Sequence, residues 1–211
     1  YALLAWECRV LNLATKTQPK HSYVEHSLDL NWISHLIKES RKDNGPIVAR
    51  AMLQEIGIVL IIEPYLTNTY LDGAALLNGD FPVIGMTLRY DRLDNFWFVL
   101  LHELFHIIKH IRKGKLETIF DDIDAEGKDN IEREADSLAE EALIPSEKWL
   151  TALPRYVQSE QSIKDFAADL GIDSSIVAGR IRYEAKNYRI LNELVGQGKV
   201  RKWFPEVNFG V

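Results

Sequence analysis

The segment from residue 94 to 112 combines a strongly apolar helical pattern with three ionisable side chains near its centre. Residues 96–101 are all apolar, Ile107 and Ile108 continue the pattern, and between them residues 102–106 read His-Glu-Leu-Phe-His. Apolar side chains around the whole circumference predict a helix that is buried on most sides. Two imidazoles and a carboxylate without partners would cost such a helix on the order of several kcal/mol. The segment therefore predicts a core helix whose polar groups serve a site.

The two histidines of this segment have the spacing of metal ligands. His102 and His106 are four residues apart, so both project from one face of a helix and could bind one ion. Glu103 is turned by about 100° from His102, so it could reach a water molecule on that ion without binding the ion itself. His110, rotated by about 80° from His102, is expected to be a neighbour of the site or a surface residue. The alternative is a pair of ordinary core histidines, because chance produces this spacing in about one such sequence in a hundred.

A third metal ligand is predicted in the most acidic part of the chain. Residues 117–141 hold eleven carboxylates and two basic residues, so the remainder of a chain with formal net charge −6 carries +3. Within this stretch, Glu132 and Asp136 lie one helical turn apart, beside the apolar stripe of a helix. Glu132 could bind the metal, while Asp136 could accept the free ring N–H of a histidine ligand. The alternative is an ordinary solvated acidic surface, which is our interpretation of residues 121–129.

Hydrophobic periodicity and turn residues predict an α+β fold. Helices are expected at residues 2–15, 29–41, 46–55, 94–112, 130–143, 146–152, 161–170 and 174–186, and strands at residues 58–63, 74–77 and 82–88. The turn sequence at residues 78–80 predicts a hairpin between the last two strands, and a small antiparallel sheet is expected. The chain is divided here into an N-terminal helical segment (1–48), a core (49–150) and a C-terminal helical subdomain (151–211).

These motifs together resemble a known family. The sequence His-Glu-Leu-Phe-His at residues 102–106, Ile-Glu-Arg-Glu-Ala-Asp at residues 131–136 and Ala-Leu-Ile-Pro at residues 142–145 are similar to the ImmA/IrrE family of small zinc metallopeptidases, over roughly residues 50 to 150. The resemblance implies a minimal gluzincin-like fold, with a small antiparallel sheet packed on the HExxH helix. It also implies Zn²⁺ as cofactor and cleavage of a DNA-binding repressor.

By position, the resemblance makes His102, His106 and Glu132 the zinc ligands and Glu103 the general base. Asp136 stands where many members carry Asn, and it keeps the hydrogen-bonding role. The expected reaction is peptide hydrolysis, in which Glu103 takes a proton from a metal-activated water. Tyr90 and Arg92, just before the helix, are candidate donors to the oxyanion or contacts of the substrate. The strand around residues 84–88 is expected to bind the substrate as an added strand.

The two ends of the chain suggest links to transcriptional regulation. The first helix resembles the segment that follows a helix-turn-helix in HigA-like antitoxins and regulators, and the chain begins with Tyr rather than Met. We therefore expect DNA contact only through a missing N-terminal domain. Residues 165–177, followed by Arg180 and Arg182, also have helix-turn-helix spacing. Asp165, Asp169 and Asp173 make a packing subdomain or a wall on the substrate side the preferred interpretation.

Composition restricts the remaining function classes. A net charge of −6 argues against non-specific nucleic-acid binding, and the apolar runs are too short to span a membrane. A single cysteine, Cys8, which we expect in the core, favours a reducing, cytoplasmic compartment. Two hypotheses remain. The first is a zinc endopeptidase that cleaves a repressor or a co-encoded toxin–antitoxin partner. The second is a catalytically silent sensor or partner-binding module of such a regulator.

Overall fold

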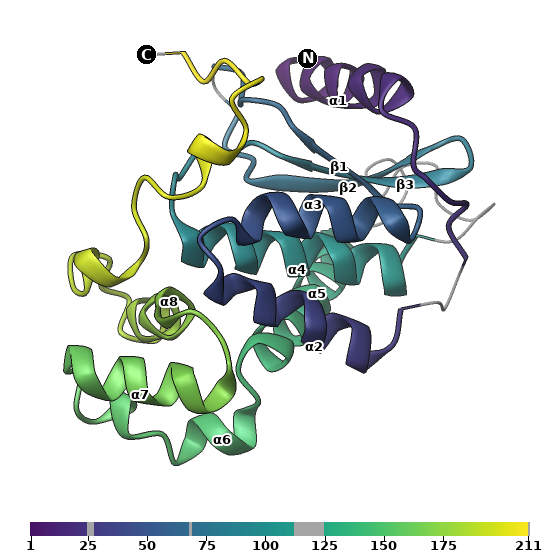
Figure 1. Ribbon diagram of the computed structural model, residues 1–211. Helices are drawn as coiled ribbons and strands as arrows, with labels where there is room; N and C mark the ends of the chain where they lie inside the picture. The colour runs from purple at the N-terminus through teal and green to yellow at the C-terminus, as the bar shows by residue number, and fades with distance from the viewer. Residues whose placement is uncertain (25–27, 68, 112–124, 211) are drawn as a thin grey trace.

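The computed structural model describes residues 1–24, 28–67, 69–111 and 125–210, and within these ranges helices surround a three-stranded sheet, consistent with the predicted α+β class (Figure 1). The helices are α1 (Ala2–Lys16), α2 (Leu30–Lys38), α3 (Gly45–Glu55), α4 (Leu93–Lys109), α5 (Ala125–Leu143), α6 (Ser146–Leu150), α7 (Glu160–Leu170) and α8 (Ser174–Glu184). The strands are β1 (Val59–Ile62), β2 (Gly73–Asn78) and β3 (Phe81–Met86). The predicted helices and strands are all present, with ends shifted by a few residues. Arg112, the predicted last residue of one helix, and the side chains of the acidic surface predicted at residues 121–129 lie outside what the structure describes.

The sheet is mixed, and the expectation of an antiparallel sheet is wrong for one of its two pairings. The strand order is β1-β3-β2, in which β2 and β3 form the predicted antiparallel hairpin and β1 runs parallel to β3. The end of β1 and the start of β2 both lie beside Met86, so the chain passes from one edge of β3 to the other at this end of the sheet. The hairpin signal concerns neighbouring strands alone, and it does not determine which edge of the hairpin a preceding strand joins.

The two faces of the sheet are covered by different helices. Helix α1 lies on one face, where Trp6, Val10 and Ala14 pack against β-strand residues such as Val59 and Val83 (Figure 1). The indole N–H of Trp6 donates to the carbonyl of Glu63, 2.9 Å away, and so ties α1 to the end of β1. Cys8 lies on the outer side of α1 and is exposed, so the expectation that it belongs to the core is wrong.

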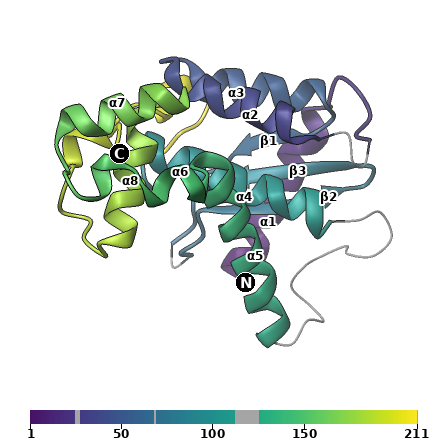
Figure 2. The ribbon, with the colours of Figure 1, turned by 90° about the horizontal axis from the view of Figure 1, so that it is seen from below.

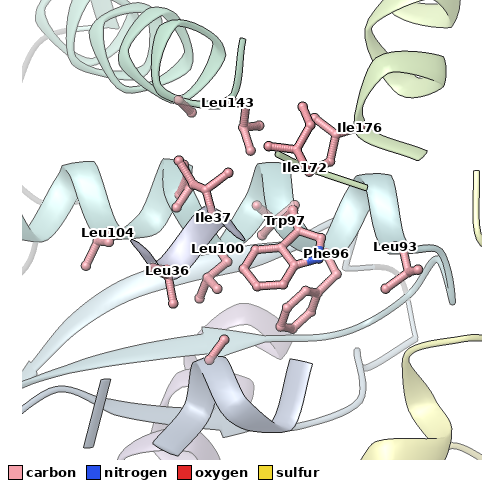
Figure 3. Close-up of a cluster of buried hydrophobic side chains, with 14 of the residues drawn as sticks. Leu36, Ile37, Leu93, Phe96, Trp97, Leu100, Leu104, Leu143, Ile172 and Ile176 are labelled. Carbon is pink, nitrogen blue, oxygen red and sulfur yellow. The ribbon is translucent and has the colours of Figure 1, made fainter. Parts of the chain in front are cut away.

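Helices α3 and α4 cover the opposite face, and α4 is the centre of the larger core. Its side chains Phe96, Trp97 and Leu100 are fully buried. Figure 3 shows them between the sheet and side chains of neighbouring helices, including Leu36 and Ile37 of α2, Leu143 of α5 and Ile176 of α8. A helix packed on this many sides has little freedom to shift, which is what a precise site on its remaining face requires.

Helices α6, α7 and α8 form a layer beside the first half of α4, and α8 packs directly on α4 (Figure 2). The helix-turn-helix spacing at residues 165–177 corresponds to the contact of α7 with α8. Arg182 is 3 % exposed, and Arg180 donates to the carbonyls of Glu140 and Ile144. Both arginines therefore interact within the protein. This favours the interpretation of α7 and α8 as a packing subdomain or a wall on the substrate side.

The C-terminal tail has no helical period but is held in place by buried side chains. Phe204 is fully buried and its ring lies 6.5 Å from that of Phe96. Val200 is also buried, and the carboxylate of Asp91 accepts hydrogen bonds from the backbone N–H groups of Val200 and Arg201. The tail thus closes the core at the beginning of α4. Among the described helices, none has both the length and the apolarity to cross a membrane.

Candidate metal centre

The face of α4 that is not packed in the core borders a cavity of about 520 Å³. His102, Glu103 and His106 line it from α4, together with Glu132, Asp136 and Glu140 of α5, residues of β2, and Ile176, Gly179, Arg180 and Tyr183 of α8. The structure therefore brings the two sequence motifs to one place, as predicted. The helix and the acidic segment that follows it in the chain share one water-accessible hollow.

Three ligand atoms converge at one end of this cavity. Nε2 of His102 and Nε2 of His106 are 2.9 Å apart, and they lie 3.2 and 3.5 Å from Oε2 of Glu132. Ligand atoms bound tetrahedrally to zinc at about 2.0–2.1 Å are separated by about 3.3 Å. The spacing and chemistry of these three groups therefore fit one zinc ion, and all three residues line the cavity.

The outer nitrogen of His102 is held by Asp136. Nδ1 of His102 lies 2.8 Å from Oδ1 of Asp136, and because an ionised carboxylate accepts but cannot donate, Nδ1 carries the proton. Nε2 of His102, once deprotonated, would then be free to bind an ion. A carboxylate behind a histidine ligand fixes its tautomer and orientation in many zinc sites. The structure thus brings Asp136 to the place predicted for it.

The outer nitrogen of His106 is held by a second chain of contacts, which includes His110. Nδ1 of His106 lies 3.0 Å from Nδ1 of His110, and Nε2 of His110 lies 3.3 Å from Oε2 of Glu134. If Nε2 of His110 donates to Glu134, its Nδ1 must accept from His106. The Nε2 of His106 is then free to bind a metal. His110 thus lies beside His106, next to the cluster, which is one of the two positions expected for it.

The ionisable groups of this cluster have strongly shifted pKa values. Burial lowers the pKa of His102, but its hydrogen bonds with Asp136 and Glu132 outweigh burial and raise it to about 10. Hydrogen bonds from His102 and His106 hold the pKa of Glu132 well below its usual range. A protonated, positively charged His102 between two carboxylates stands in for a cation, so the site is electrostatically built to hold positive charge.

Glu103 is buried beside the triad and faces β2. Its side chain has 5 % of its surface exposed, and burial raises its pKa to about 8, with the nearby His102 opposing this shift. A backbone hydrogen bond from Ala75 also opposes it. At Gly73 an added Cβ would lie 2.7 Å from Cγ1 of Val99 and 2.8 Å from Oε1 of Glu103. The glycine thus lets β2 approach α4 closely enough to enclose the carboxylate.

The predicted oxyanion donors take different positions. Arg92 lines the cavity, but its Nε and Nη2 donate to Asp94 at 2.9 and 2.5 Å. Tyr90 is not among the residues that line the cavity, and its ring lies 4.7 Å from the guanidinium of Arg89. Tyr183 of α8 lines the cavity instead, and sequence reasoning missed it. Its spacing of seven residues from the buried Ile176 would have placed both on one helical face.

The strand that borders the site is β2, and the expectation that residues 84–88 receive a substrate strand is wrong. Strand β3 is central, with β1 on one edge and β2 on the other, so its backbone groups are already paired. Strand β2 is an edge strand, and Gly73, Ala74 and Ala75 line the cavity. An edge strand has backbone donors and acceptors with which an extended peptide can pair.

The comparisons with known proteins agree with this geometry. The model of the M78 peptidase family, described as the IrrE N-terminal-like domain, matches residues 53–182. The match covers both motifs, all three strands and most of α8. It leaves out α1, α2 and most of α3. A search of curated proteins finds no significant match to the chain. Since the matched region is more than half of its length, this chain belongs to the M78 peptidase family with an IrrE N-terminal-like domain.

Proposed function

We propose that this domain is a zinc-dependent endopeptidase that cuts an extended segment of a regulatory protein. The observation that carries the proposal is the convergence of His102, His106 and Glu132 within 3.5 Å of one another, with the buried carboxyl of Glu103 beside them. A site that bound zinc for structure alone would not need Glu103 there. Bound zinc would supply an activated water and polarise the carbonyl of the peptide bond.

Glu103 is suited to move a proton between water and the departing amine. Burial raises its pKa to about 8, close to the neutral range in which a general base and acid works best. Its carboxylate would take a proton as the water attacks and then deliver it to the new amino terminus. The backbone hydrogen bond from Ala75 orients the carboxylate.

The substrate would lie along the outer edge of β2, and Tyr183 would face its cleaved carbonyl. The negative charge of Glu140, followed by burial, raises the pKa of Tyr183, so its hydroxyl keeps its proton and can donate a hydrogen bond. This residue replaces Tyr90 as our candidate for the oxyanion donor. The resemblance to ImmA/IrrE peptidases supports a repressor or toxin–antitoxin partner as substrate, cleaved in the cytoplasm.

The test is cleavage of a candidate repressor-type protein encoded near this chain's gene. We expect zinc-loaded protein to cut it at one position, identified by mass spectrometry, and the Glu103→Gln variant to bind zinc but leave it intact. Cleavage by Glu103→Gln at the normal rate would exclude the mechanism. If the wild-type protein binds one zinc and cuts neither this partner nor unstructured peptides, the domain is a silent sensor module of a regulator.

A further inference from the structure

The cavity continues well beyond the metal ligands, along α4 to the start of the helix. Asp94, Asn95, Phe98 and Val99 line it before the ligands of the same helix are reached. Arg92, the residue at the N-terminal cap of α4, lies ten residues before His102. Ten residues of helix span about 15 Å, which an extended peptide covers with about four to five residues. A substrate lying in this groove would therefore place a side chain near Arg92 at that separation from the cleaved bond.

The two ends of the groove differ in charge. Four carboxyl groups, those of Glu103, Glu132, Asp136 and Glu140, line the metal end, where Arg180 is the cation of the lining. At the far end Asp72 pairs with Arg89, and two further arginines, Arg92 and Arg182, stand around the carboxylate of Asp94. With a divalent ion bound, these four carboxylates and Arg180 would still give the metal end a net negative charge. The far end carries the positive charge of the groove.

Asp94 orients the guanidinium of Arg92 but binds only two of its three nitrogens. Its side chain is 16 % exposed, and Asp94 binds its Nε and Nη2, so Asp94 leaves Nη1 unengaged. The ring of Tyr90 lies 5.7 Å from the guanidinium. An arginine that is already oriented loses little side-chain entropy when it binds a carboxylate, so it is a good anchor for one.

Arg182 adds a positive charge behind this end of the groove. Its side chain is buried, its Nη2 donates to the carbonyl of Tyr188, and its Nε and Nη1 lack a hydrogen-bond partner among the described residues. Helix α8 is pressed against Asp94 here, since an added Cβ at Gly179 would lie 2.8 Å from Oδ2 of Asp94. Asp94 offsets one of the two arginine charges. A buried charge that is not offset is costly, so an incoming anion would be stabilised.

The direction of a bound peptide follows from the direction of β2. Gly73, at the start of β2, lies against Val99 and Glu103, and the preceding Asp72 pairs with Arg89 near the start of α4. Strand β2 therefore runs in the same sense as α4. A peptide that pairs antiparallel with β2, the more stable arrangement, runs the opposite way. The residues that follow the cleaved bond then point towards Arg92.

We propose that Arg92, backed by Arg182, forms a subsite for the side chain of an Asp or Glu that lies four to five residues after the cleaved bond. The proposal rests on the peptide groove of the proposed function and specifies its substrate class. It selects regulatory proteins whose cleaved segment is followed by acidic residues. Asn95 and Tyr188, which line the same end of the cavity, supply additional polar groups around the bound carboxylate.

The test uses a pair of zinc-anchored peptide probes whose binding needs no turnover. Each probe is a succinyl hydroxamate with an isobutyl group, followed by Ala-Ala-Asp-Asp or Ala-Ala-Asn-Asn and a C-terminal amide, so that only side chains supply carboxylates. Isothermal titration of the zinc-loaded protein should show the Asp probe binding about tenfold more tightly than the Asn probe. Equal affinities, or no binding of either probe, would overturn the subsite.

Variants assign the preference to the arginine. Arg92→Gln should reduce the difference between the probes to less than about twofold, while Arg92→Lys, which keeps the charge, should retain most of it. Arg50→Gln is the matched control, because Arg50 is also partly buried, paired with Glu206 and stacked on an aromatic ring, Phe204. If Arg92→Gln does not fold by circular dichroism, the wild-type comparison of the probes still decides. A protein that prefers the Asp probe but cleaves nothing would contradict the peptidase proposal and leave the subsite standing.

Discussion

Replacement of His110 by Leu is expected to weaken zinc binding although His110 is not a predicted ligand. In the metal-bound protein, Nε2 of His106 faces the ion, so Nδ1 must carry the proton and needs an acceptor. His110 supplies it at 3.0 Å, in surroundings where His106 is only 4 % exposed. In the metal-free protein His106 can adopt the other tautomer and donate from Nε2 to Oε2 of Glu132, 3.5 Å away. Loss of the acceptor therefore destabilises mainly the metal-bound protein.

The size of the effect follows from this difference. A buried donor without a partner costs about 1–3 kcal/mol, which corresponds to a loss of about 5- to 150-fold in zinc affinity. Loss of a residue behind a metal ligand typically costs about 10- to 100-fold, in the same range. Leu fills a similar volume, and the side chain of His110 is 8 % exposed, so the fold should tolerate the change.

The assay is competition for zinc with a chromophoric chelator of known affinity. His110→Asn, whose side-chain oxygen can still accept from His106, should restore the affinity to within about threefold of wild type. Glu134→Gln, which also keeps an acceptor, should change it by less than about threefold. A His110→Leu protein that binds zinc as tightly as the wild type would refute the reasoning, because the His106 contact would then contribute nothing.

Three further predictions concern the groove, the cluster and the core. Gly73→Ala should lower the free energy of unfolding by about 1–3 kcal/mol, because its Cβ would collide with Val99 and Glu103; an unchanged urea midpoint would contradict this. Zinc affinity should rise by about tenfold per pH unit between pH 6 and 8, because in the metal-free protein His102, with its pKa raised to about 10, holds a proton that zinc must displace. Titrations that show no pH dependence would exclude that proton. Phe204→Ala should lower the free energy of unfolding by about 3–5 kcal/mol in chemical denaturation, because the ring is fully buried against Phe96. A loss below about 1 kcal/mol, the cost of a surface change, would show that the tail is not part of the core.

The elements that could be predicted from sequence are those whose signal is local. The apolar circumference of α4, the beginning of a helix near Asp29 and the hairpin turn before Phe81 depend on residues close in the chain, and each was predicted correctly. Glu132 and Asp136 were also placed correctly beside His102, because their spacing on α5 matches the spacing of the histidines on α4.

The remaining features depend on contacts between distant segments. The position of β1 beside β3 is set by how a ten-residue connection crosses the sheet, and no local pattern records it. This error also misplaced the expected substrate strand, since an edge strand can be recognised only after the order is known. Tyr183 enters the cavity because α8 packs on α4, eighty residues earlier in the chain. The Glu134–His110–His106 chain likewise needs the approach of α5, which helical geometry on α4 alone does not show.

The central claim is that His102, His106 and Glu132 hold one zinc ion, and metal content tests it most directly. Zinc should be measured by mass spectrometry after the purified protein has been loaded and dialysed, in the wild type, in Glu132→Ala and in Glu134→Gln as the matched acidic control. We expect about one equivalent in the wild type and in Glu134→Gln, and less than about a tenth of an equivalent in Glu132→Ala. Equal zinc in all three proteins, or none in the wild type, would contradict the account.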